Sequence, residues 1–503
     1  MSTPDQPAAT LPYSLLSTEQ IRDLEAFALS QGLARGELMA RAGEALYAAA
    51  RRLRPDSSGP WWIICGSGNN GGDGYVLARL ARAAGVTVRL FACAPPRQGS
   101  DAEQACQRWL QSGGDVELEW PAADHAPDLV VDALLGIGQC SAPRPAVAAW
   151  IDAINQLAAP VLAVDIPSGL LADSGAAPGA VVRASATLSL LALTPGLFTG
   201  RGPDVCGAVW HHPLASLPVS PDVLLAQRLD YAAICNLLPR RPRTAHKGTC
   251  GRVLIIGGAP GMSGAVRLAG EGALRAGAGL VRVLTHPQHA SLLNIGCPEL
   301  MVSSSDQAPT APDWPSIRVL GPGLGQTSWS ESLWQMQLTV PGVLLLDADA
   351  LSWLARQPQH RDNWVLTPHP GEAARLLGCS VAEVEADRLA SVRALQRRYG
   401  GVVVLKGAGS LICDGQQLWL CTEGNPGMAS GGMGDLLSGI IAALYAQGLP
   451  LATACCVGVC IHGEAADLAA CAGERGLLAS DLLPLIRRLV NPQDTMNHVS
   501  IPD

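Results

Sequence analysis

Aromatic and charged residues are both scarce in this sequence of 503 amino acids. Only 4% of the residues are Phe, Trp or Tyr and only 16% are charged, whereas 48% are hydrophobic. A chain of this composition is not intrinsically disordered, because disorder goes with low hydrophobicity and high charge. Together with 55 glycines, the composition is typical of a globular α/β protein with many tight turns between strands and helices.

The sequence also lacks an excess of positive charge and a visible targeting segment. Its formal net charge is −8, which argues against nucleic acid or an anionic membrane as the main partner. The first residues show no basic stretch followed by an apolar core. Later apolar runs are interrupted before the ~20 residues that a membrane helix needs. We therefore expect a cytoplasmic protein with no nucleic-acid and no membrane partner, whose phosphate sites are built locally.

Several motifs of well-known chemistries are missing. Neither GxxxxGK[ST] nor HExxH occurs, so a P-loop NTPase or a zinc protease of that type is unsupported. The 15 cysteines are scattered and are expected to be buried, reduced thiols rather than disulfides or zinc ligands. Cys456 and Cys460 could meet across one helix turn, but two thiols without nearby His or acidic partners make a poor metal site.

The length and the order of predicted elements indicate two domains. A chain of 503 residues exceeds what one hydrophobic core usually serves. A helical period over 17–54, with Ser17 or Thr18 as the cap, predicts a pair of helices. Short apolar runs then alternate with helical stretches, which predicts strands at 61–65, 86–91, 129–134 and 161–165 and, after a Pro-rich basic linker between 211 and 250, at 253–257, 317–320, 343–347, 364–367 and 402–406. We predict two α/β domains, 1–222 and 226–497, each with a mainly parallel sheet covered by helices.

A Gly-rich segment in the first domain, GSGNNGGDG at 66–74, runs from a buried strand into a helix that we expect to start near Tyr75. Glycines allow close approach of a ligand to the backbone, and the N–H groups of a helix start favour phosphate. Such a turn can also serve only to close a strand-to-helix corner. The embedded Asn69, Asn70 and Asp73 add polar groups that a corner does not need, so we favour ligand binding.

Two further strand ends carry polar groups, DALLGIG at 132–138 and VDIPSG at 164–169. Ligands of open α/β sheets bind at the carboxyl ends of the strands, where these turns would converge. Asn70, Asp132 and Ser168 offer oxygen atoms without His or Cys, which suits a hard cation better than zinc. Asp132 and Asp173 could instead each cap a turn, and the matching strand ends are what favours a site.

The sharpest motif of the second domain is NPGMASGGMGD at 425–435, followed by an apolar helix over 436–445. Small residues at a helix start present several N–H groups to one point, which predicts an anion hole for a transferring phosphoryl group. Asp435 is placed to accept a proton from an attacking hydroxyl. The alternative is that Asp435 merely complements the helix dipole.

Other segments of the second domain also carry candidate ligand groups. Lys406 follows a buried strand and precedes a Gly-rich turn, so it could steer a nucleotide phosphate. His369 is held between two prolines, where we favour substrate contact over a packing role. The turns at 257–265 and 321–325 supply two more backbones that a ligand could approach.

The motifs GSGNNGGDGY, DALLGIG, VDIPSG and TPGLFTGRGPDVCG together resemble the N-terminal epimerase domain of the bifunctional NAD(P)H-hydrate repair enzymes, over about residues 15–217. The resemblance implies a Rossmann-like three-layer α/β/α domain in which Asp165 touches the substrate and acts as acid and base. It implies that the hydrated dinucleotide binds at Asn69, Asn70, Gly71, Gly72, Asp73, Gly136, Ile137, Gly138, Gln139, Cys140, Ser141 and Ala142. Potassium would bind at Asn70, Asp132 and Ser168. Ile137 stands where the family pattern has Thr, and Thr194 where it has Lys.

The second half is similar to the ADP-dependent NAD(P)H-hydrate dehydratases, within the ribokinase-like fold. The motifs that carry this resemblance are GMSGAVRLAGEGALRAGAGLV, GPGLG, TPHPGE, KGAGS and GNPGMASGGMGD, in that order. It implies that the hydrated nucleotide contacts Ala265, Gly323, His369 and Asp435. The adenine nucleotide would lie against Lys406, Gly407, Ala408, Gly409, Ser410 and Gly434, with magnesium bridging its phosphates and Asp435 as the catalytic base. Met262 replaces an aromatic residue of some relatives.

The two resemblances together imply a repair enzyme for NADHX and NADPHX, the hydrates of NADH and NADPH. The first domain would interconvert their R and S forms, and the second would dehydrate the S form with ADP, giving AMP and phosphate, in a homo-oligomer. Two alternatives remain at this point. A kinase for a small alcohol such as a vitamin precursor would use the same anion hole and Asp base, and a non-catalytic nucleotide sensor would bind without turnover.

Overall fold

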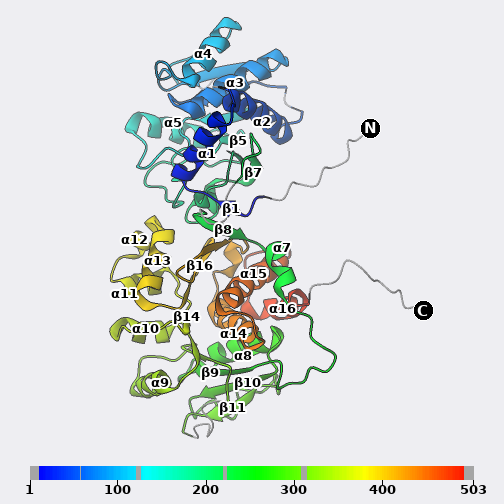
Figure 1. The fold of residues 1–503 in the computed structure, drawn as a ribbon, viewed down its shortest axis with the longest axis vertical. Helices are drawn as coiled ribbons and strands as arrows, with labels where there is room; N and C mark the ends of the chain where they lie inside the picture. The colour runs from blue at the N-terminus through cyan, green and yellow to red at the C-terminus, as the bar shows by residue number, and fades with distance from the viewer. Residues whose placement is uncertain are drawn as a thin grey trace, which may run out of the picture. The chain divides into compact units, whose positions relative to one another are not determined.

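The computed structural model describes residues 11–34, 36–56, 58–120, 126–218, 224–306 and 314–491. The chain forms two compact units, Met1–Arg228 and Leu229–Asp503 (Figure 1). The division falls inside the stretch in which we expected the linker. The predicted domain limits at 1, 222 and 497 lie outside the described residues.

The first unit begins with the predicted pair of helices, α1 (Thr18–Ser30) and α2 (Glu37–Leu53). Ser17 caps α1 by accepting a hydrogen bond from the N–H of Gln20, whose side chain returns a bond to the N–H of Ser17. This reciprocal arrangement satisfies two of the free donors of a helix start. It explains why the chain turns into a helix at this residue.

A six-stranded sheet forms the centre of the first unit, in the order β3-β2-β4-β5-β6-β7 with all strands parallel. Its strands are β2 (Trp61–Cys65), β3 (Val88–Ala92), β4 (Leu129–Ala133), β5 (Val161–Val164), β6 (Ala186–Leu190) and β7 (Ala208–His212). The two short strands β1 (Ser14–Leu15) and β8 (Ala226–Leu229) pair antiparallel. The first four sheet strands match the predicted ones to within two residues, whereas β6 and β7 were not predicted.

Helices cover both faces of this sheet, as a three-layer α/β/α domain requires. In β2, Ile63 and Cys65 belong to the core on the side of α2 and α3 (Asn69–Ala83), while Trp62 and Ile64 belong to the core on the side of α5 (Pro145–Asn155). The alternation follows from the two-residue period of a strand. The remaining helices are α4 (Asp101–Gln111) and α6 (Gly202–Val205), with the short η1 (Pro195–Leu197).

The second unit contains a sheet in the order β17-β16-β15-β14-β13-β12-β9-β10-β11. The strands from β15 to β11 run parallel, and β16 and β17 form an antiparallel edge. Their bounds are β9 (Arg252–Gly257), β10 (Leu280–Thr285), β11 (Met301–Ser304), β12 (Ile317–Leu320), β13 (Val343–Leu346), β14 (Trp364–Leu366), β15 (Val402–Leu405), β16 (Ser410–Cys413) and β17 (Leu418–Cys421). All five predicted strands of this half are present.

The helices of the second unit lie on the two faces of its sheet (Figure 1). One group consists of α8 (Ser263–Arg275), α14 (Met433–Ala446), α15 (Leu451–Ala470) and α16 (Leu483–Leu489). Helices α8 and α14 pack on strands β9, β10 and β12, and α15 packs on β15, β16 and β17. Helix α16 packs against α8 and α15, and α7 (Tyr231–Ile234) packs against α15. The other group consists of α9 (Ser328–Thr339), α10 (Asp349–Arg356), α11 (Pro370–Leu377), α12 (Val381–Ala386) and α13 (Arg388–Tyr399). Short 3-10 turns η3, η4 and η5 span Cys235–Leu237, Pro426–Met428 and Ala479–Leu482.

Helix α15 differs from the sequence-based expectation. Leu451–Ala470 is long and apolar enough, by length and composition alone, to cross a membrane, although we expected every apolar run to be interrupted earlier. Of the 18-residue apolar stretch of this helix, 67% is buried inside the unit. The helix packs there against α14 and α16. A core helix that is apolar nearly all round is typically surrounded by its own protein.

In both sheets the order in which the chain adds strands reverses in the middle of the sheet. This reversal fixes where ligands can bind. In the first unit β3 and β4 lie on opposite sides of β2, and in the second β10 and β12 lie on opposite sides of β9. The connections that leave the carboxyl ends of such neighbouring strands diverge and leave a crevice between them. The Gly-rich segments predicted as ligand sites follow these strands in both units.

Candidate active sites

Three predicted cation ligands of the first unit lie together at the switch point of its sheet. Asp132, fully buried at the end of β4, accepts Ser168 Oγ at 2.6 Å and the Ser168 N–H at 2.8 Å. The Leu135 carbonyl accepts both Asn70 Nδ2 at 3.0 Å and Ser168 Oγ at 3.2 Å. Burial raises the pKa of Asp132 to about 6, although the hydrogen bonds from Ser168 oppose this. The strand ends therefore converge as the sequence predicted.

Gly136 keeps the oxygen side of this cluster open. A Cβ atom at Gly136 would lie 3.1 Å from Asn70 Oδ1, so a side chain there would crowd the amide oxygen. The donor set is one carboxylate and neutral oxygens, which suits a hard cation. The residues present therefore fit a potassium ion.

Asp165 follows β5 in a left-handed backbone conformation, with φ of 67°. Such a φ is rare for residues other than glycine, and Asp and Asn tolerate it best. Its Oδ1 accepts the Leu190 N–H at 3.1 Å. Burial raises the pKa of Asp165 to about 7, with the charge of Glu25 contributing to the rise and the hydrogen bond from the Leu190 N–H opposing it. Burial likewise raises the pKa of Asp73, with Asp165 and Glu25 adding to the effect, so these three carboxyl groups form one coupled cluster.

The Gly-rich segment is not a loop before the helix, and the expected helix start near Tyr75 is wrong. Helix α3 begins at Asn69. A Cβ at Gly71 would lie 2.0 Å from Gly66 O, and one at Gly74 would lie 2.8 Å from Cys65 Sγ. These glycines let the first turns of α3 pack directly on β2 and its following turn. Gly72 is buried against Met39 in the same way, and within Asn69–Gly74 the residues with side chains are Asn69, Asn70 and Asp73.

The predicted substrate segment 136–142 extends from the cation cluster to the surface. Gln139 ties it down, since its Oε1 accepts the Gly169 N–H at 3.0 Å and its Nε2 donates to Ser141 O at 2.8 Å. Gly138, Cys140, Ser141 and Ala142 are exposed. Ile137 is half-buried and its carbonyl accepts Thr18 Oγ1 at 3.2 Å.

Two other residues of the first unit have structural roles. Asp173 accepts the Thr18 N–H at 2.8 Å and Thr18 Oγ1 at 3.0 Å, so it anchors the start of α1. Thr194 is buried and precedes the 3-10 turn η1.

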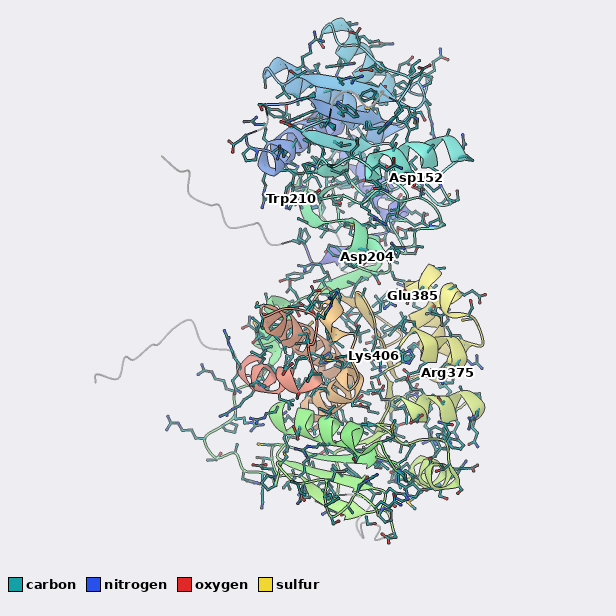
Figure 2. All side chains as sticks on the ribbon, turned by 180° about the vertical axis from the view of Figure 1, so that it is seen from behind. Asp152, Asp204, Trp210, Arg375, Glu385 and Lys406 are labelled. Carbon is teal, nitrogen blue, oxygen red and sulfur yellow. The ribbon has the colours of Figure 1, made fainter. Side chains whose placement is uncertain are left out.

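In the second unit, a buried ion pair lies at the carboxyl edge of the sheet. Lys406 Nζ donates to Asp347 Oδ1 at 2.8 Å, and Ser438 Oγ donates to Asp347 Oδ2 at 2.8 Å. Burial acts to raise the pKa of Asp347, but Lys406 and the hydrogen bonds outweigh it and lower that pKa. Burial acts to lower the pKa of Lys406, yet Asp347 and Glu372 raise it. Figure 2 shows Lys406 toward the middle of this unit.

His369 and Glu372 form a reciprocal cap at the start of helix α11. His369 Nδ1 accepts the Gly371 N–H at 3.0 Å, while Glu372 Oε2 accepts the His369 N–H at 2.8 Å. The His369 ring is half-exposed and its Nε2 lies 3.4 Å from Glu372 Oε1. Burial raises the pKa of Glu372 to about 7, although Lys406, 3.9 Å away, opposes it. His369 thus combines a capping role with an exposed ring edge.

Asp435 lies in the first turn of α14, as predicted, one residue after Gly434. The first N–H of this helix to bond inside it is that of Leu436, to Gly432 O. The N–H groups of Met433, Gly434 and Asp435 precede it and have no partner within the helix. Burial raises the pKa of Asp435 to about 7, with Asp347 adding to the effect and Lys406 opposing it.

The loop before α14 contains a further polar group directed inward. Ser430 Oγ is buried and lacks a hydrogen-bond partner among the described residues. Asn425 opens the loop by accepting the Gly427 N–H at 3.0 Å. Buried hydroxyl groups are normally paired, so the position favours a ligand oxygen opposite Ser430.

The turns after β9 and β12 lie against each other, as the position of these strands requires. The Ala259 N–H donates to Gly323 O at 2.7 Å. Gly323 has φ of 53°, and a Cβ there would lie 2.7 Å from Met262 Cβ and 3.1 Å from Ala265 Cβ. The predicted substrate residues Ala265 and Gly323 are therefore neighbours, with the half-exposed Met262 beside them.

The turn after β15 holds the predicted nucleotide residues Lys406, Gly407, Ala408, Gly409 and Ser410. Gly407 has φ of 139° and a Cβ there would lie 2.8 Å from the Arg388 guanidinium. Arg388 is buried and donates to Lys406 O at 3.1 Å. Gly407 and Ala408 are exposed in the turn, and Ser410 Oγ closes it by donating to Gly407 O at 3.1 Å.

Four residues of these sites were not singled out in the sequence. They are Asp347, Glu372, Ser438 and Glu25. Asp347 ends a predicted strand and Glu372 stands in TPHPGE, directly after another predicted strand. Their position after strand ends is the sequence signal that could have identified them as site residues. Ser438 and Glu25 lie inside apolar or amphipathic helices, where nothing in the sequence marks them.

Family models match both units of the chain. The model described as NAD(P)H-hydrate dehydratase matches residues 253–488, and the model described as YjeF-related protein N-terminus matches residues 35–196.

Curated relatives align over nearly the whole chain. The Bifunctional NAD(P)H-hydrate repair enzyme Nnr of Escherichia coli K12 is 47% identical over 97% of this chain and 96% of its own length. The protein of the same name from Coxiella burnetii is 44% identical over 95% of this chain and 99% of its own length.

Solved structures match the second unit. A ribokinase-like superfamily protein from Enterococcus faecalis V583 has a TM-score of 0.50 and 27% identity, covering 55% of this chain and 98% of that chain. The ADP/ATP-dependent NAD(P)H-hydrate dehydratase of Bacillus subtilis, co-crystallised with ATP and Mg²⁺, has a TM-score of 0.48 and 30% identity, covering 52% of this chain and 95% of that chain. The ribokinase-like fold predicted for the second half is confirmed.

Proposed function

Because the chain belongs to the family of bifunctional NAD(P)H-hydrate repair enzymes, we propose that it restores hydrated NADH and NADPH in two steps. The first unit interconverts the R and S hydrates. The second unit dehydrates the S hydrate with ADP and releases AMP and phosphate. The observation that carries this proposal is Asp435, with a pKa of about 7, beside three N–H groups that α14 leaves unbonded.

The dehydration proceeds by making the hydroxyl a better leaving group. The hydrate oxygen attacks the β-phosphorus of ADP, its proton passes to the Asp435 carboxylate, and the bond to the AMP oxygen breaks. The phosphate ester then loses phosphate from its carbon and a proton from the neighbouring ring carbon to solvent, and the double bond that forms restores the dihydronicotinamide ring. Phosphate is a far weaker base than hydroxide and leaves more readily. The N–H groups at the start of α14, with Ser430 Oγ near them in the chain, face the charge that develops on the phosphoryl oxygens.

Lys406 supplies positive charge beneath the same helix start. Asp347 holds its ammonium group in place at 2.8 Å, and a Cβ at Gly434 would lie 3.1 Å from Nζ. The absent side chain at Gly434 therefore lets the nucleotide phosphates approach this charge. Magnesium is bound mostly by phosphate oxygens and water, so it needs only one or two carboxylates from the protein. A carboxylate near this edge of the sheet, such as that of Asp349, would be sufficient. When bound, it neutralises phosphate charge.

Asp165 serves as acid and base of the epimerisation. Its pKa of about 7 means that both protonation states are populated near neutral pH, as proton transfer in either direction requires. The Leu190 N–H holds one carboxyl oxygen of Asp165, whose backbone is in the left-handed conformation. Burial keeps the pKa of Asp165 high, and the negative charge of Glu25 adds to this effect.

Potassium is proposed for the cluster of Asn70, Asp132 and Ser168. Support comes from the open amide oxygen beside Gly136 and from the buried Asp132 carboxylate. A bound cation would fix the 136–142 segment at its base and so shape the substrate surface.

The two alternatives are not favoured. A small-alcohol kinase would need only the second unit, whereas the relatives match both units over nearly their full length. A non-catalytic sensor does not need a carboxyl group of raised pKa beside an anion hole.

We further propose a cytoplasmic homo-oligomer. All fifteen cysteines are free thiols, which supports a reducing compartment. Light scattering on the purified chain would measure the assembly.

The test of the proposed function is recovery of reduced nicotinamide absorbance from an R and S mixture of hydrated NADH. With ADP and Mg²⁺ the wild-type chain should recover the whole mixture, and the nucleotide product should be AMP. A stable phosphorylated product would favour the kinase instead. No recovery with either ADP or ATP would refute the proposal.

A further inference from the structure

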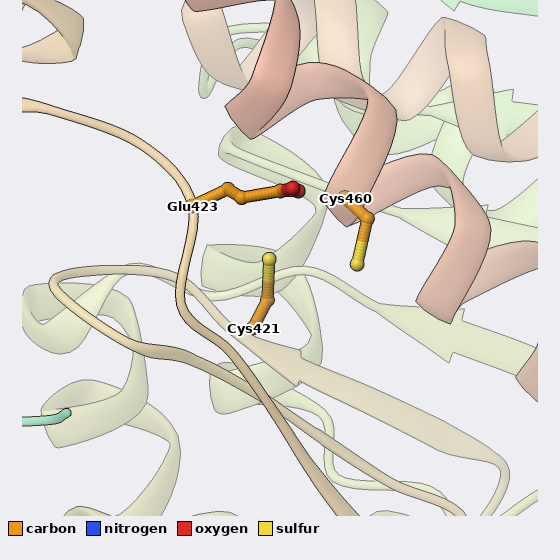
Figure 3. Close-up of side chains that lie close together, drawn as sticks. All are labelled: Cys421, Glu423 and Cys460. Carbon is orange, nitrogen blue, oxygen red and sulfur yellow. The ribbon is translucent and has the colours of Figure 1, made fainter. Parts of the chain in front are cut away.

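Three potential metal ligands of the second unit converge outside both proposed active sites. One ligand atom from each of Cys421, Glu423 and Cys460 lies within 4.8 Å of the others. Cys421 ends strand β17, Glu423 follows it, and Cys460 projects from the middle of α15 (Figure 3). The three side chains point toward one another from two elements that are far apart in sequence.

The position is buried and one of its oxygens lacks a partner. Cys421 and Cys460 are fully buried. Glu423 Oε1 accepts the Tyr231 N–H, whereas Oε2 is buried without a hydrogen-bond partner among the described residues. A buried carboxylate oxygen left alone is costly. The free oxygen is thus a second observation that points to a bound cation.

A further thiol stands on the same helix as Cys460. Cys456 stands one helical turn before Cys460 and interacts electrostatically with both Cys421 and Cys460. We expected from the sequence that Cys456 and Cys460 have no acidic partner nearby. That expectation is wrong, because the fold brings Glu423 to Cys460 from a strand whose position the sequence alone does not give.

We propose that Cys421, Glu423 and Cys460 bind one thiophilic divalent cation of the zinc class, with Cys456 or water as the fourth ligand. The two thiols lose their protons to solvent as two metal–sulfur bonds form, and Glu423 adds a metal–oxygen bond. A tetrahedral zinc ion with bonds of about 2.0–2.3 Å holds its ligand atoms roughly 3.5–3.8 Å apart. Rotations that move the side-chain ends by about an ångström close the shell.

The proposed ion would stiffen the approach to the anion hole. Glu423 stands two residues before Asn425, where the loop that leads to Asp435 begins. Asp467 of α15 already holds this start, since it accepts the Gly424 N–H at 2.9 Å and Asn425 Nδ2 at 2.8 Å. A metal bridge from β17 to α15 would tie the same loop about two turns of α15 earlier.

The test uses the full chain, reduced and freed of metal, and titrated with Co²⁺ alone. We expect one equivalent of Co²⁺ to bind with the thiolate charge-transfer and tetrahedral visible bands, and to release two protons. Zn²⁺ should displace it, and Zn²⁺ but not Mg²⁺ should raise the melting temperature. These measurements on wild type need no variant and do not depend on turnover.

Variants assign the ligands. Cys421→Ser and Cys460→Ser should each weaken Co²⁺ binding at least about tenfold, and Glu423→Gln should do so with the thiolate bands retained. Cys471→Ser, at the exposed end of the same helix, is the matched control and should bind like wild type. Absence of the charge-transfer bands in wild type would overturn the proposal. Equal binding by Cys421→Ser and Cys460→Ser variants that remain folded by circular dichroism would also overturn it.

Discussion

Lys406 and Asp347 are joined by a contact of 2.8 Å between Nζ and Oδ1. Both side chains lie close to the position that a Cβ atom of Gly434 would occupy. The pair connects the ends of β15 and β13 with the start of α14. Its position means that the same charge pair supports the fold and prepares the phosphate site.

Removing one partner of this pair should cost stability. Asp347→Ala leaves the Lys406 ammonium buried without its counter-ion, so we expect a loss of about 3–5 kcal/mol in the free energy of unfolding of the second unit. Denaturant unfolding measures it. The double variant with Lys406→Met should lose less than the sum of the single losses, and simple additivity would show that the two residues do not depend on each other.

Asp435→Asn should abolish proton acceptance while keeping the shape of the site. We expect the dehydration rate to fall by about 10²–10⁴-fold, measured as absorbance recovery from the S hydrate. Nucleotide affinity and R to S interconversion are the controls and should change little. A loss of less than tenfold would assign Asp435 to the helix dipole alone.

The dehydration rate should depend on pH through Asp435. Its raised pKa of about 7 means that the carboxyl group is protonated, and unable to accept a proton, at lower pH. The rate should therefore fall about tenfold per pH unit below 7. Since Lys406 lowers the pKa of Asp435, Lys406→Met should shift the midpoint to higher pH. A profile that is flat from pH 5 to 8 would contradict the assignment.

Asp165→Asn should separate the two activities. We expect R to S interconversion to be lost while dehydration of the S hydrate continues, so that recovery stops when the S form is consumed. Asn tolerates the left-handed φ of 67°, so the fold should persist. Asp152→Asn, at an exposed position of the same unit, is the control, and equal rates for both variants would exclude Asp165 as the acid and base.

The same variant should change the pH dependence of stability. The pKa of Asp165 is raised in the folded protein, so the contribution of this group is most favourable below its unfolded pKa and is lost as pH rises toward and through 7. Asp165→Asn removes that loss. Its melting temperature relative to wild type should therefore be higher at pH 8 than at pH 5, and the reverse order would contradict the burial of this charge.

Asp132→Asn should weaken the proposed potassium site. We expect the epimerisation rate of the wild-type chain to rise with KCl, and the variant to need a higher concentration or to respond no longer. Sodium at equal ionic strength is the control. Equal rates of wild type with and without potassium would remove the ion from the proposal.

Much of the fold could be predicted because parallel strands buried on both faces are continuous apolar runs. Runs such as Trp61–Cys65 and Val402–Leu405 were recognisable for this reason. Strands β6 and β11 contain Thr and Ser, so they lack that signal. The sequence pattern places the start of α3 too late, because glycines are typical of loops, whereas these glycines serve close packing on β2.

The candidate sites divide in the same way. Asp132 and Asp435 could be recognised from the sequence, because Asp132 lies at the end of an apolar strand and Asp435 follows a Gly-rich run at a helix start. The partners Ser438 and Glu25 depend on which helix faces which strand end, a distance in space that local sequence does not carry.

The residues proposed for each site lie within one compact unit, and both units belong to one continuous chain. Covalent linkage then fixes the ratio of the two catalysts at one to one in every molecule that is synthesised. A cell cannot correct a slow epimerisation by making more of that catalyst alone, so natural selection acts on the rate constants of the two sites rather than on their relative abundance.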